Sequence, residues 1–542
     1  MIRKNRVLLI VYNAAHFREL SRLAKVFIDS GMFVPLMLFV SPYPNMSEHC
    51  QQCSRLGVQA WIRGQPLQPT SHKAWAPALL LLNLLLKITQ FIARLLLLGL
   101  LPSIAVNILR RITKLASSLY TEILSYIETI KLAVYSKLRS SDSLIVQLLR
   151  AYRQLSYARI VCRTLRPDLV VLAEDNVEYI SGAWVRAAHR IGIPVMIVPY
   201  CLAGLDEPAA VYANDVRHQA DIPENRPLVR SYPQWVYEYQ GRRLVRMPAH
   251  QALPLEWLGI SSPLPWLMNG TYADVIAVES PFMRDYYLKQ GVAREQIVLT
   301  GTAGDDAIHE SLQNISLYRE QLYACYGMLT ERPMILCALP PITSAMAALR
   351  EEFSSYAEML RFWLDCLREI ENFNIFISLH PTMSREDFAF LDELGWWGMA
   401  LAPPDTARMI ALCDIYIASV SSTIRWAIAC GKPVINYDVY RFRFPDYRPA
   451  RGVVTVERKE EFRQVLHRIT SDKQYYEALR LAQIECQAYW GMIDGKSSLR
   501  LINLAEHLIE KRQVQCRKSA PERFSKFIGK FLHSNKPAYS KC

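Results

Sequence analysis

A chain of 542 residues with 51% hydrophobic and 21% charged residues has the composition of an ordinary globular protein, long enough for two or three domains, which excludes a wholly disordered polypeptide. The net charge of +13 is concentrated in two segments: residues 73–153 hold 11 Lys and Arg against three acidic residues, and residues 511–542 hold nine against one. The remainder is close to neutral, which argues against a nucleic-acid enzyme, because such an enzyme has basic residues along its working groove.

The first 40 residues have the pattern of a strand, a helix and a second strand. The apolar run at 7–12 predicts a buried strand, a helix follows from Phe17 to Ser30, and residues 33–40 predict the next strand. The turn between the first strand and the helix lacks G-x-G-x-x-G, which argues against a tightly bound dinucleotide, and we expect no cofactor. The strand begins directly after residue 5 with no signal-peptide pattern, and the 12 cysteines are scattered, so we expect reduced thiols and a cytoplasmic protein.

A Leu-rich helical insertion is expected at about 72–160, where a plain nucleotide-binding fold would continue. Within 77–109 the charges are Lys87 and Arg94, and with Asn83 and Gln90 they form one polar stripe at helical spacing. Their insertion cost roughly cancels the gain from the leucines, so a spanning helix is marginal. We expect residues 77–114 to lie at the membrane interface, with a helical hairpin buried in the protein as the alternative. The tail segment 523–533 predicts a second interfacial helix, with a disordered basic tail as its alternative. Together they predict peripheral association with the inner face of the cell membrane.

The alternation of strands and helices returns after the insertion. Strands are expected at 168–173, 194–199, 274–278 and 297–300, and residues 200–265 are expected to be irregular loops over a cleft. A second series starts at 334–339 and continues through strands at 374–379, 415–417, 433–436 and 453–456. This predicts an α/β fold with two Rossmann-like domains. The boundaries that we expect are 1–304 for an N-terminal acceptor domain, 305–512 for a C-terminal nucleotide-donor domain, and 513–542 for a basic tail.

Strand ends of the second series carry hydroxyls and an imidazole but no acidic residue. Since ligands of open α/β sheets bind outside the carboxyl ends of the strands, these residues predict a diphosphate site in which helix N-termini and His380 neutralise the donor. Asp438, after a further strand, is expected to bind a ribose hydroxyl. Ser422 as a simple helix N-cap and Asp438 as a turn aspartate are the alternatives. The donor-binding residues expected here are Thr343, Ser344, His380, Pro381, Ser419, Ser421, Ser422, Thr423 and Asp438.

Strand ends of the first series carry His16, Glu174, Asp175 and Glu279. Any of the first three could remove a proton from an attacking hydroxyl, and the alternative for each is a helix cap. The patterns S-x-x-K, G-x-S-x-G and H-E-x-x-H of common hydrolases are missing. The pair Cys50 and Cys53 lacks a second pair of ligands at zinc-site spacing, and we expect no metal.

Four segments resemble glycosyltransferases of the two-Rossmann GT-B fold. They are SPFMRDYYLKQGVAREQIVLTGTAGDDA (280–307), SLHP (378–381), DIYIASVSSTIRWAIACGKPVINYD (414–438) and VYNAAHFRELSRLAKVFIDSG (11–31). The branch that they resemble contains UDP-N-acetylglucosamine 2-epimerases and the glycerophosphotransferases and capsule transferases with CDP- or CMP-activated donors. The resemblance implies that His380, Pro381, Ser421 and Ser422 bind the donor's nucleotide and phosphates, and that His16 faces the acceptor or the donor.

The chain departs from that branch in two ways. The epimerases have Ser-Gly-Gly where this chain has Ser421, Ser422 and Thr423, which weakens the case for epimerisation. The Leu-rich insertion has no counterpart in the compact soluble members and suggests a lipid-linked or polysaccharide acceptor.

The resulting hypothesis is an inverting, metal-independent transferase of bacterial surface polysaccharide biosynthesis. Its donor would be a nucleotide-activated sugar or a related phosphosugar or polyol phosphate, with no nucleic-acid partner. The alternatives are a nucleotide-sugar 2-epimerase and a non-catalytic membrane-bound scaffold that keeps the GT-B shape.

Overall fold

The computed structural model describes most of the chain outside the Leu-rich insertion and the basic tail. The described residues are 3–64, 143–199, 204–270, 272–340, 342, 349, 351–380, 383, 399–403, 405–444, 446–512 and 514. The interfacial helices expected at 77–114 and 523–533 therefore lie outside the described residues. Within the described residues, no helix combines the length and the apolar character that crossing a membrane would require.

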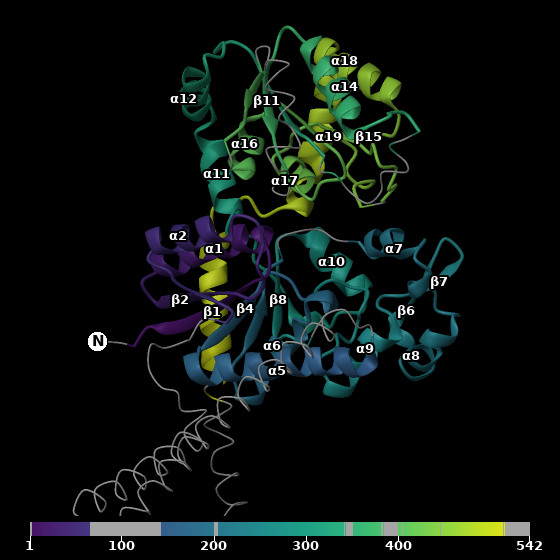
Figure 1. Ribbon diagram of the computed structural model, residues 1–542. Helices are drawn as coiled ribbons and strands as arrows, with labels where there is room; N and C mark the ends of the chain where they lie inside the picture. The colour runs from purple at the N-terminus through teal and green to yellow at the C-terminus, as the bar shows by residue number, and fades with distance from the viewer. Residues whose placement is uncertain are drawn as a thin grey trace, which may run out of the picture. The chain divides into compact units, whose positions relative to one another are not determined.

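The first domain is built on a seven-stranded parallel sheet (Figure 1). Its strand order has β1 beside both β2 and β4, so the order reverses between β1 and β4, the point at which doubly wound sheets bind ligands. In sheet order the strands are β3 (Gln59–Ile62), β2 (Phe33–Phe39), β1 (Asn5–Val11), β4 (Leu169–Leu172), β5 (Val195–Ile197), β8 (Val275–Val278) and β9 (Ile297–Leu299). The strands expected from the sequence are confirmed, whereas β3 was not expected.

Both faces of this sheet are covered by helices. On one face, alternate residues of β1, including Val7 and Leu9, pack with α1 and with the helix 497–512. On the other face, Tyr12 accepts a hydrogen bond from Trp184 of α6. Asn13 caps α1 by accepting the N–H of His16. The helices that pack around this sheet are α1 (Ala14–Asp29), α2 (Met46–Arg55), α5 (Leu144–Leu165), α6 (Gly182–Arg190) and α10 (Pro281–Lys289).

The stretch 200–265 is more ordered than expected. It holds short helices and a two-stranded antiparallel hairpin whose contacts are centred on Leu244 and Trp266. The sequence shows no long periodic pattern here, because each helix has at most ten residues and each strand has four. These elements are α7 (Asp206–Tyr212), α8 (Arg226–Ser231), β6 (Val236–Tyr239), β7 (Arg242–Val245) and α9 (Ala249–Leu258). The short 3₁₀ turns of the first domain are Val177–Tyr179, Val216–His218, Pro223–Asn225, Pro233–Trp235 and Arg294–Gln296.

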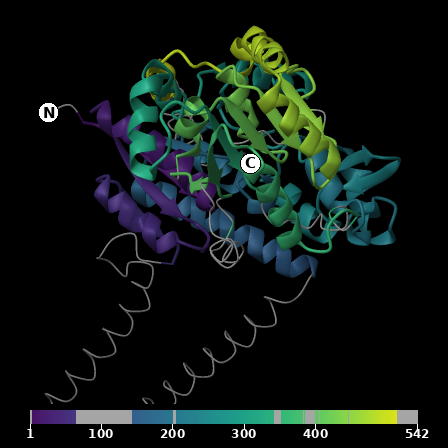
Figure 2. The same ribbon diagram turned by 90° about the horizontal axis from the view of Figure 1, so that it is seen from above.

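The second domain repeats the design with a six-stranded parallel sheet (Figure 2). Residues Ile335 and Ile417 face α14 and α18, whereas Leu336 and Tyr416 face α16 and α17. The strands in sheet order are β12 (Met399–Leu401), β11 (Asn374–Ser378), β10 (Met334–Ala338), β13 (Ile415–Ala418), β14 (Val434–Tyr437) and β15 (Val453–Val456). The helices are α11 (Asp305–Gln313), α12 (Ile315–Tyr326), α14 (Tyr356–Arg368), α16 (Thr406–Leu412), α17 (Ile424–Ala429), α18 (Lys459–Ser471) and α19 (Lys473–Trp490). The expectation of two Rossmann-like domains is thus confirmed.

One domain boundary differs from the expectation. A single helix was expected over 473–512, but α19 ends at Trp490 and a separate helix runs over 497–512. Leu501, Ala505 and Leu508 of that helix are buried in the core of the first domain, so the end of the range 305–512 belongs there. Asp306 accepts hydrogen bonds from the N–H groups of Ser497 and Ser498 at 2.9 and 2.8 Å. These bonds tie the start of the helix 497–512 to the start of α11, where the chain passes from the first domain to the second.

Candidate functional site

His16 and Glu174 meet at the carboxyl ends of the two central strands of the first sheet. β1 and β4 are parallel neighbours with Ile10 opposite Leu172, and both functional residues follow shortly after these positions. Nε2 of His16 lies 3.1 Å from Oε2 of Glu174, and both side chains are buried. Asn176 donates a hydrogen bond to Oε1 of Glu174 at 2.8 Å, so both carboxylate oxygens have a partner.

The surrounding turns explain why His16 is held in this place. The expected alternative of a helix cap applies to other residues, because Asn13 caps α1 and Asn176 caps the turn at Val177–Tyr179. The His16 ring meets the ring of Tyr12 edge-on, with centroids 5.8 Å apart, and Tyr12 stacks on Tyr179. These contacts fix the orientation of the imidazole toward Glu174.

Asp175 points to a different environment from its neighbour Glu174. Ser181 donates a hydrogen bond to its carboxylate at 2.5 Å, and its backbone exchanges hydrogen bonds with Asn269. These partners tie the turn after β4 to the segment before β8. Of the three candidate bases, His16 and Glu174 therefore form a pair, and Asp175 anchors the loop beside them.

In the second domain, Ser421 and Thr423 form a hydroxyl cluster with Tyr416 after β13. Oγ of Ser421 lies 2.7 Å from Oγ1 of Thr423, which lies 2.6 Å from the hydroxyl of Tyr416. The preceding residue, Val420, has a φ of +44° and donates its N–H to Asn436. A β-branched residue in the left-handed region costs about 1–3 kcal/mol, and such strain is concentrated at ligand-binding turns.

The helix that follows this turn is shorter and less capped than the phosphate hypothesis assumed. α17 has six residues, and its N-cap, Thr423, makes no capping hydrogen bond with its side chain. The alternative of Ser422 as the N-cap is therefore wrong, and fewer than two helical turns supply only a small dipole. The hydroxyl of Ser419 is buried and has no hydrogen-bond partner among the described residues. The cluster thus offers hydroxyls and backbone N–H groups rather than a strong helix dipole.

His380 lies at the end of β11, next to β10 and two strands from the Ser421 turn. Burial, and secondarily the nearby Arg18 of the first domain, lower the pKa of His380 to about 4. The side chain is therefore uncharged at neutral pH and does not supply the positive charge that we expected. Thr343, Ser344 and Pro381 lie outside the described residues.

Asp438 is engaged within its own loop. Its two carboxylate oxygens accept the N–H groups of Phe442 and Arg443 at 3.0 and 2.6 Å. Burial raises the pKa of Asp438, and these hydrogen bonds oppose the rise. The residue is placed as the turn aspartate that formed the alternative to ribose binding.

A buried ion pair joins the two domains directly beside the hydroxyl cluster. Arg425 of α17 contacts Glu279, which follows β8, and both side chains are almost fully buried. The guanidinium also lies 5.3 Å from the ring of Trp426. Glu279 was expected at a strand end, whereas Arg425 was missed. Its signal in the sequence is one charged residue inside the apolar run of a short helix.

Beside this pair lies Asp305, whose carboxylate accepts hydrogen bonds from the N–H and hydroxyl of Thr302 at 2.7 and 2.8 Å. Burial raises the pKa of Asp305 to about 7, against the lowering effect of Thr302 and Arg425. In the unfolded chain the carboxyl titrates near its ordinary value, so the folded protein binds the extra proton between the two values.

A pH effect on stability follows from Asp305. Because its pKa is raised on folding, its contribution favours the folded state at lower pH and is lost as the pH rises through 7. We expect Asp305 to contribute about 1 kcal/mol to the increase in the free energy of unfolding from pH 8 to pH 6.5, measured by urea unfolding of the wild type and the Asp305→Asn variant. The Asp305→Asn variant is expected to show a smaller increase. An equal increase in wild type and variant would assign the effect to other groups, such as Glu207.

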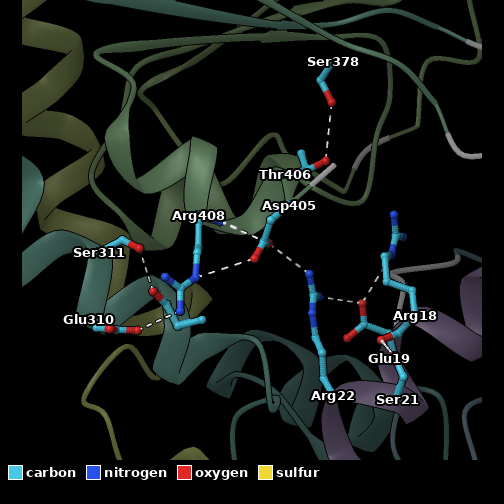
Figure 3. A network of polar contacts seen from close by, with 11 residues as sticks. Arg18, Glu19, Ser21, Arg22, Glu310, Ser311, Ser378, Asp405, Thr406 and Arg408 are labelled. Carbon is cyan, nitrogen blue, oxygen red and sulfur yellow. Dashed lines mark hydrogen bonds and ion pairs between the residues drawn. The ribbon is translucent and has the colours of Figure 1, made fainter. Parts of the chain in front are cut away.

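A second polar network connects the domains at α1, α11 and α16 (Figure 3). Arg22 of α1 donates to Asp405 at 3.1 Å and to Glu19 at 3.0 Å. Arg408 of α16 contacts Glu310 of α11 at 2.8 Å. This network reaches Arg18, which lies 3.6 Å from Glu19 and also influences His380. The charged groups of α1 thus hold the domains together next to the candidate site.

Glu207 is a further residue that the sequence did not single out. Burial and the neighbouring Asp446 of the second domain raise its pKa to about 7, Arg246 opposes the rise, and Glu174 adds to it. The side chain is exposed to solvent, which limits the effect of burial on its pKa. Only the folding of this part of the first domain brings Glu207 close to Asp446, so no local pattern in the sequence could have identified Glu207.

Two cavities of about 760 and 550 Å³ in the described part of the chain lie elsewhere. The larger is between α6 and α9, with Arg186, Arg190 and Glu256 in its lining, and the smaller is between α12 and α16. Neither contains a residue of the pair or of the hydroxyl cluster. The candidate site therefore rests on the strand ends and their hydrogen bonds.

The cysteine pair of α2 packs against the core of the first domain. Cys53 is buried in the core, and the ring of His49 stacks on Phe17 with centroids 4.0 Å apart. Over the described ranges, His, Cys, Asp and Glu side chains form no group of three or more that could hold a metal ion.

No protein-family model matches the chain, and no curated protein matches it in sequence. Its fold is similar to that of S. aureus MnaA in complex with UDP, with a TM-score of 0.49, 13% identity, and coverage of 93% of this chain and 97% of that one. The UDP-GlcNAc 2-epimerase of Neisseria meningitidis bound to UDP-GlcNAc gives a TM-score of 0.47, 12% identity, and coverage of 92% and 99%. The wall teichoic acid polymerase TagF gives a TM-score of 0.35, 14% identity, and coverage of 44% and 59%. These proteins belong to the group that the sequence resembles, and their identities leave the reaction of this chain open.

Proposed function

We propose that the chain is an inverting, metal-independent transferase that uses a nucleotide-activated donor, a sugar or a related phosphosugar or polyol phosphate. The observation that carries the proposal is the buried pair of His16 and Glu174 at the strand ends where the first sheet reverses its order. The interdomain pair of Glu279 and Arg425 joins the helix after the hydroxyl cluster to the end of β8 in the first domain, which supports a site shared by the two domains. Acid–base groups on one domain and neutral donors on the other suit group transfer between two substrates.

The donor's diphosphate would bind at the turn of Ser419, Ser421 and Thr423. The hydroxyls of the cluster now bond to one another, and each can rotate to donate to a phosphate oxygen. His380 is neutral in the free protein and can donate one hydrogen bond. A bound anion would raise its pKa, so donor binding would take up a proton at slightly acidic pH.

The reaction follows from the pair in the first domain. When the donor is a sugar linked to a nucleoside diphosphate, the acceptor hydroxyl would lose its proton to His16 while its oxygen attacks the anomeric carbon of the donor. The bond from that carbon to the diphosphate breaks, and the nucleoside diphosphate leaves with the electron pair. Glu174 engages Nε2 of His16, so the proton would be taken at Nδ1 once acceptor binding has opened the buried site, with the carboxylate stabilising the imidazolium.

The acceptor in this proposal is a lipid-linked or polysaccharide chain at the inner face of the bacterial cell membrane. Its support is the resemblance of the sequence and the basic, Leu-rich segment at 73–153. A surface polysaccharide is assembled on such an acceptor, which agrees with a basic protein whose folded domains are themselves close to neutral.

A panel of UDP-, CDP- and GDP-activated donors, each with and without membrane lipid, tests the proposal. Donor consumption that requires an acceptor is the expected result, and Ser421→Ala should weaken donor binding by about tenfold through the lost hydroxyl. Ser471→Ala, on the exposed side of α18, is the matched control and should bind the donor like wild type. Isomerisation of the donor without acceptor would identify an epimerase instead. If no donor is consumed or isomerised, the result would favour the non-catalytic scaffold. The complete burial of His16 would agree with that outcome.

A further inference from the structure

The inner and outer sides of α5 have different characters. Ala151, Leu155, Ala158 and Cys162 recur at intervals of three or four and are buried against the first domain. Tyr157 on the same helix meets Trp184 of α6 edge-on, with ring centroids 6.0 Å apart. Helical spacing therefore turns the remaining residues away from the protein core.

Large apolar side chains occupy that outer side. Tyr152 and Ile160 are 52% and 58% exposed, and Ile145 and Leu149 earlier in the helix are 70% and 46% exposed. Their spacing of three, four and eight residues places all four within one stripe of a regular helix. Several large apolar side chains exposed along one helix face mark an interaction site.

The charges of α5 are of one sign. Residues 143–167 contain five arginines and no acidic residue. Arg153 and Arg163 are exposed and fall in the same outer stripe as Tyr152 and Ile160 by helical spacing. Arginine can lay its apolar stem along a hydrocarbon surface and keep the guanidinium at the level of phosphates. Alternation of apolar residues and arginines along one helix face is the pattern of helices that lie in the interface of anionic membranes.

We infer that the outer face of α5, defined by Tyr152, Arg153, Ile160 and Arg163, docks the first domain on a bilayer with anionic headgroups. The charge complementarity selects a lipid surface, because the described residues of the helix offer no carboxylate for a basic partner. In the sequence, the basic segment 73–153 ends within α5, so the helix carries part of the charge that is concentrated there. The inference does not depend on the proposed reaction.

Binding of the full-length protein to vesicles tests this inference without donor or acceptor. The vesicles are phosphatidylcholine with phosphatidylglycerol, compared with phosphatidylcholine alone. The double variant Arg153→Gln with Arg163→Gln is expected to reduce partition onto the anionic vesicles by about tenfold or more. The variant Tyr152→Ser with Ile160→Ser is expected to reduce it similarly. Because binding free energies of separate surfaces add, these fold-changes hold even if another segment also binds lipid.

Two controls separate docking from unfolding and from another occupant. Leu317→Ser with Leu481→Ser removes two residues that are each 50% exposed on other helices and should leave partition unchanged. Hydrogen exchange of the peptide 144–166 should slow when anionic vesicles are added. Unchanged partition of both α5 variants would overturn the inference. Exchange that is already slow and unaffected by vesicles would also overturn it, and would assign the face to another part of the chain.

Discussion

His16→Gln is expected to lower kcat by at least about a thousandfold while the donor still binds. Gln keeps a polar side chain of similar size in the buried site but cannot accept and release a proton near neutral pH. The loss would come from the transition state, where the acceptor proton must move, and the dissociation constant of the donor should change little. Single-turnover rates and donor titrations on the same preparation measure the two quantities separately.

Two adjacent carboxylates provide a matched comparison for the same hypothesis. Glu174 faces His16, whereas Asp175 accepts its hydrogen bond from Ser181. Glu174→Gln should lower kcat by about a hundredfold or more and shift the acidic limb of the pH–rate profile downward, because a neutral amide stabilises the imidazolium less. Asp175→Asn should reduce thermal stability but leave the profile in place. Equal effects of the two variants would mean that the turn after β4 acts only as a structural unit.

The sequence was sufficient for those parts of the fold that depend on local patterns. Runs such as 7–12 and 334–339 could only be buried parallel strands, and each came with a helix of clear periodicity. From parallel strands alone it followed that the residues after them share one edge, and His16 and Glu174 do meet there. The same reasoning placed β10, β11 and β13 side by side, which the sheet order confirms.

Elements with weak patterns were missed for physical reasons. α2, with the sequence MSEHCQQCSR, buries only Cys53, so its amphipathic signal is faint, and β3 is a four-residue edge strand. The helix 497–512 continues the helical composition of α19, and the break at Gly491 has no strong stop signal such as proline. Its packing on the first domain depends on Leu501 and Leu508 fitting a sheet nearly 500 residues away in sequence.

The candidate site shows the same division between local and long-range information. The serine-rich turn was recognisable, but the exchange of hydrogen bonds among Tyr416, Ser421 and Thr423 replaced the cap expected from Ser422. The low pKa of His380 arises from burial and from Arg18 of the other domain. Neither can be read from SLHP, because both require the two domains to be placed together.

The interdomain ion pair leads to the largest expected effect on stability. Arg425→Met would leave Glu279 as a buried carboxylate without its main counter-charge, which costs about 3–5 kcal/mol. Glu279→Gln should cost a similar amount, because a buried guanidinium then loses its partner. Replacing both with Met should restore most of the stability, since an apolar pair of similar volume needs no compensating charge.

An exposed ion pair in the second domain supplies the control. Arg451 contacts Glu485 at 2.5 Å, with the two side chains 75% and 64% exposed. Arg451→Met should therefore cost less than about 1 kcal/mol. Urea unfolding of the four variants measures the differences, with a probe in each domain because the two can unfold separately. If Arg425→Met costs no more than Arg451→Met, the domains do not hold Arg425 and Glu279 in buried contact. The hydroxyl cluster would then lack its buried link to the first domain, and the proposal of a site shared by the two domains would lose that support.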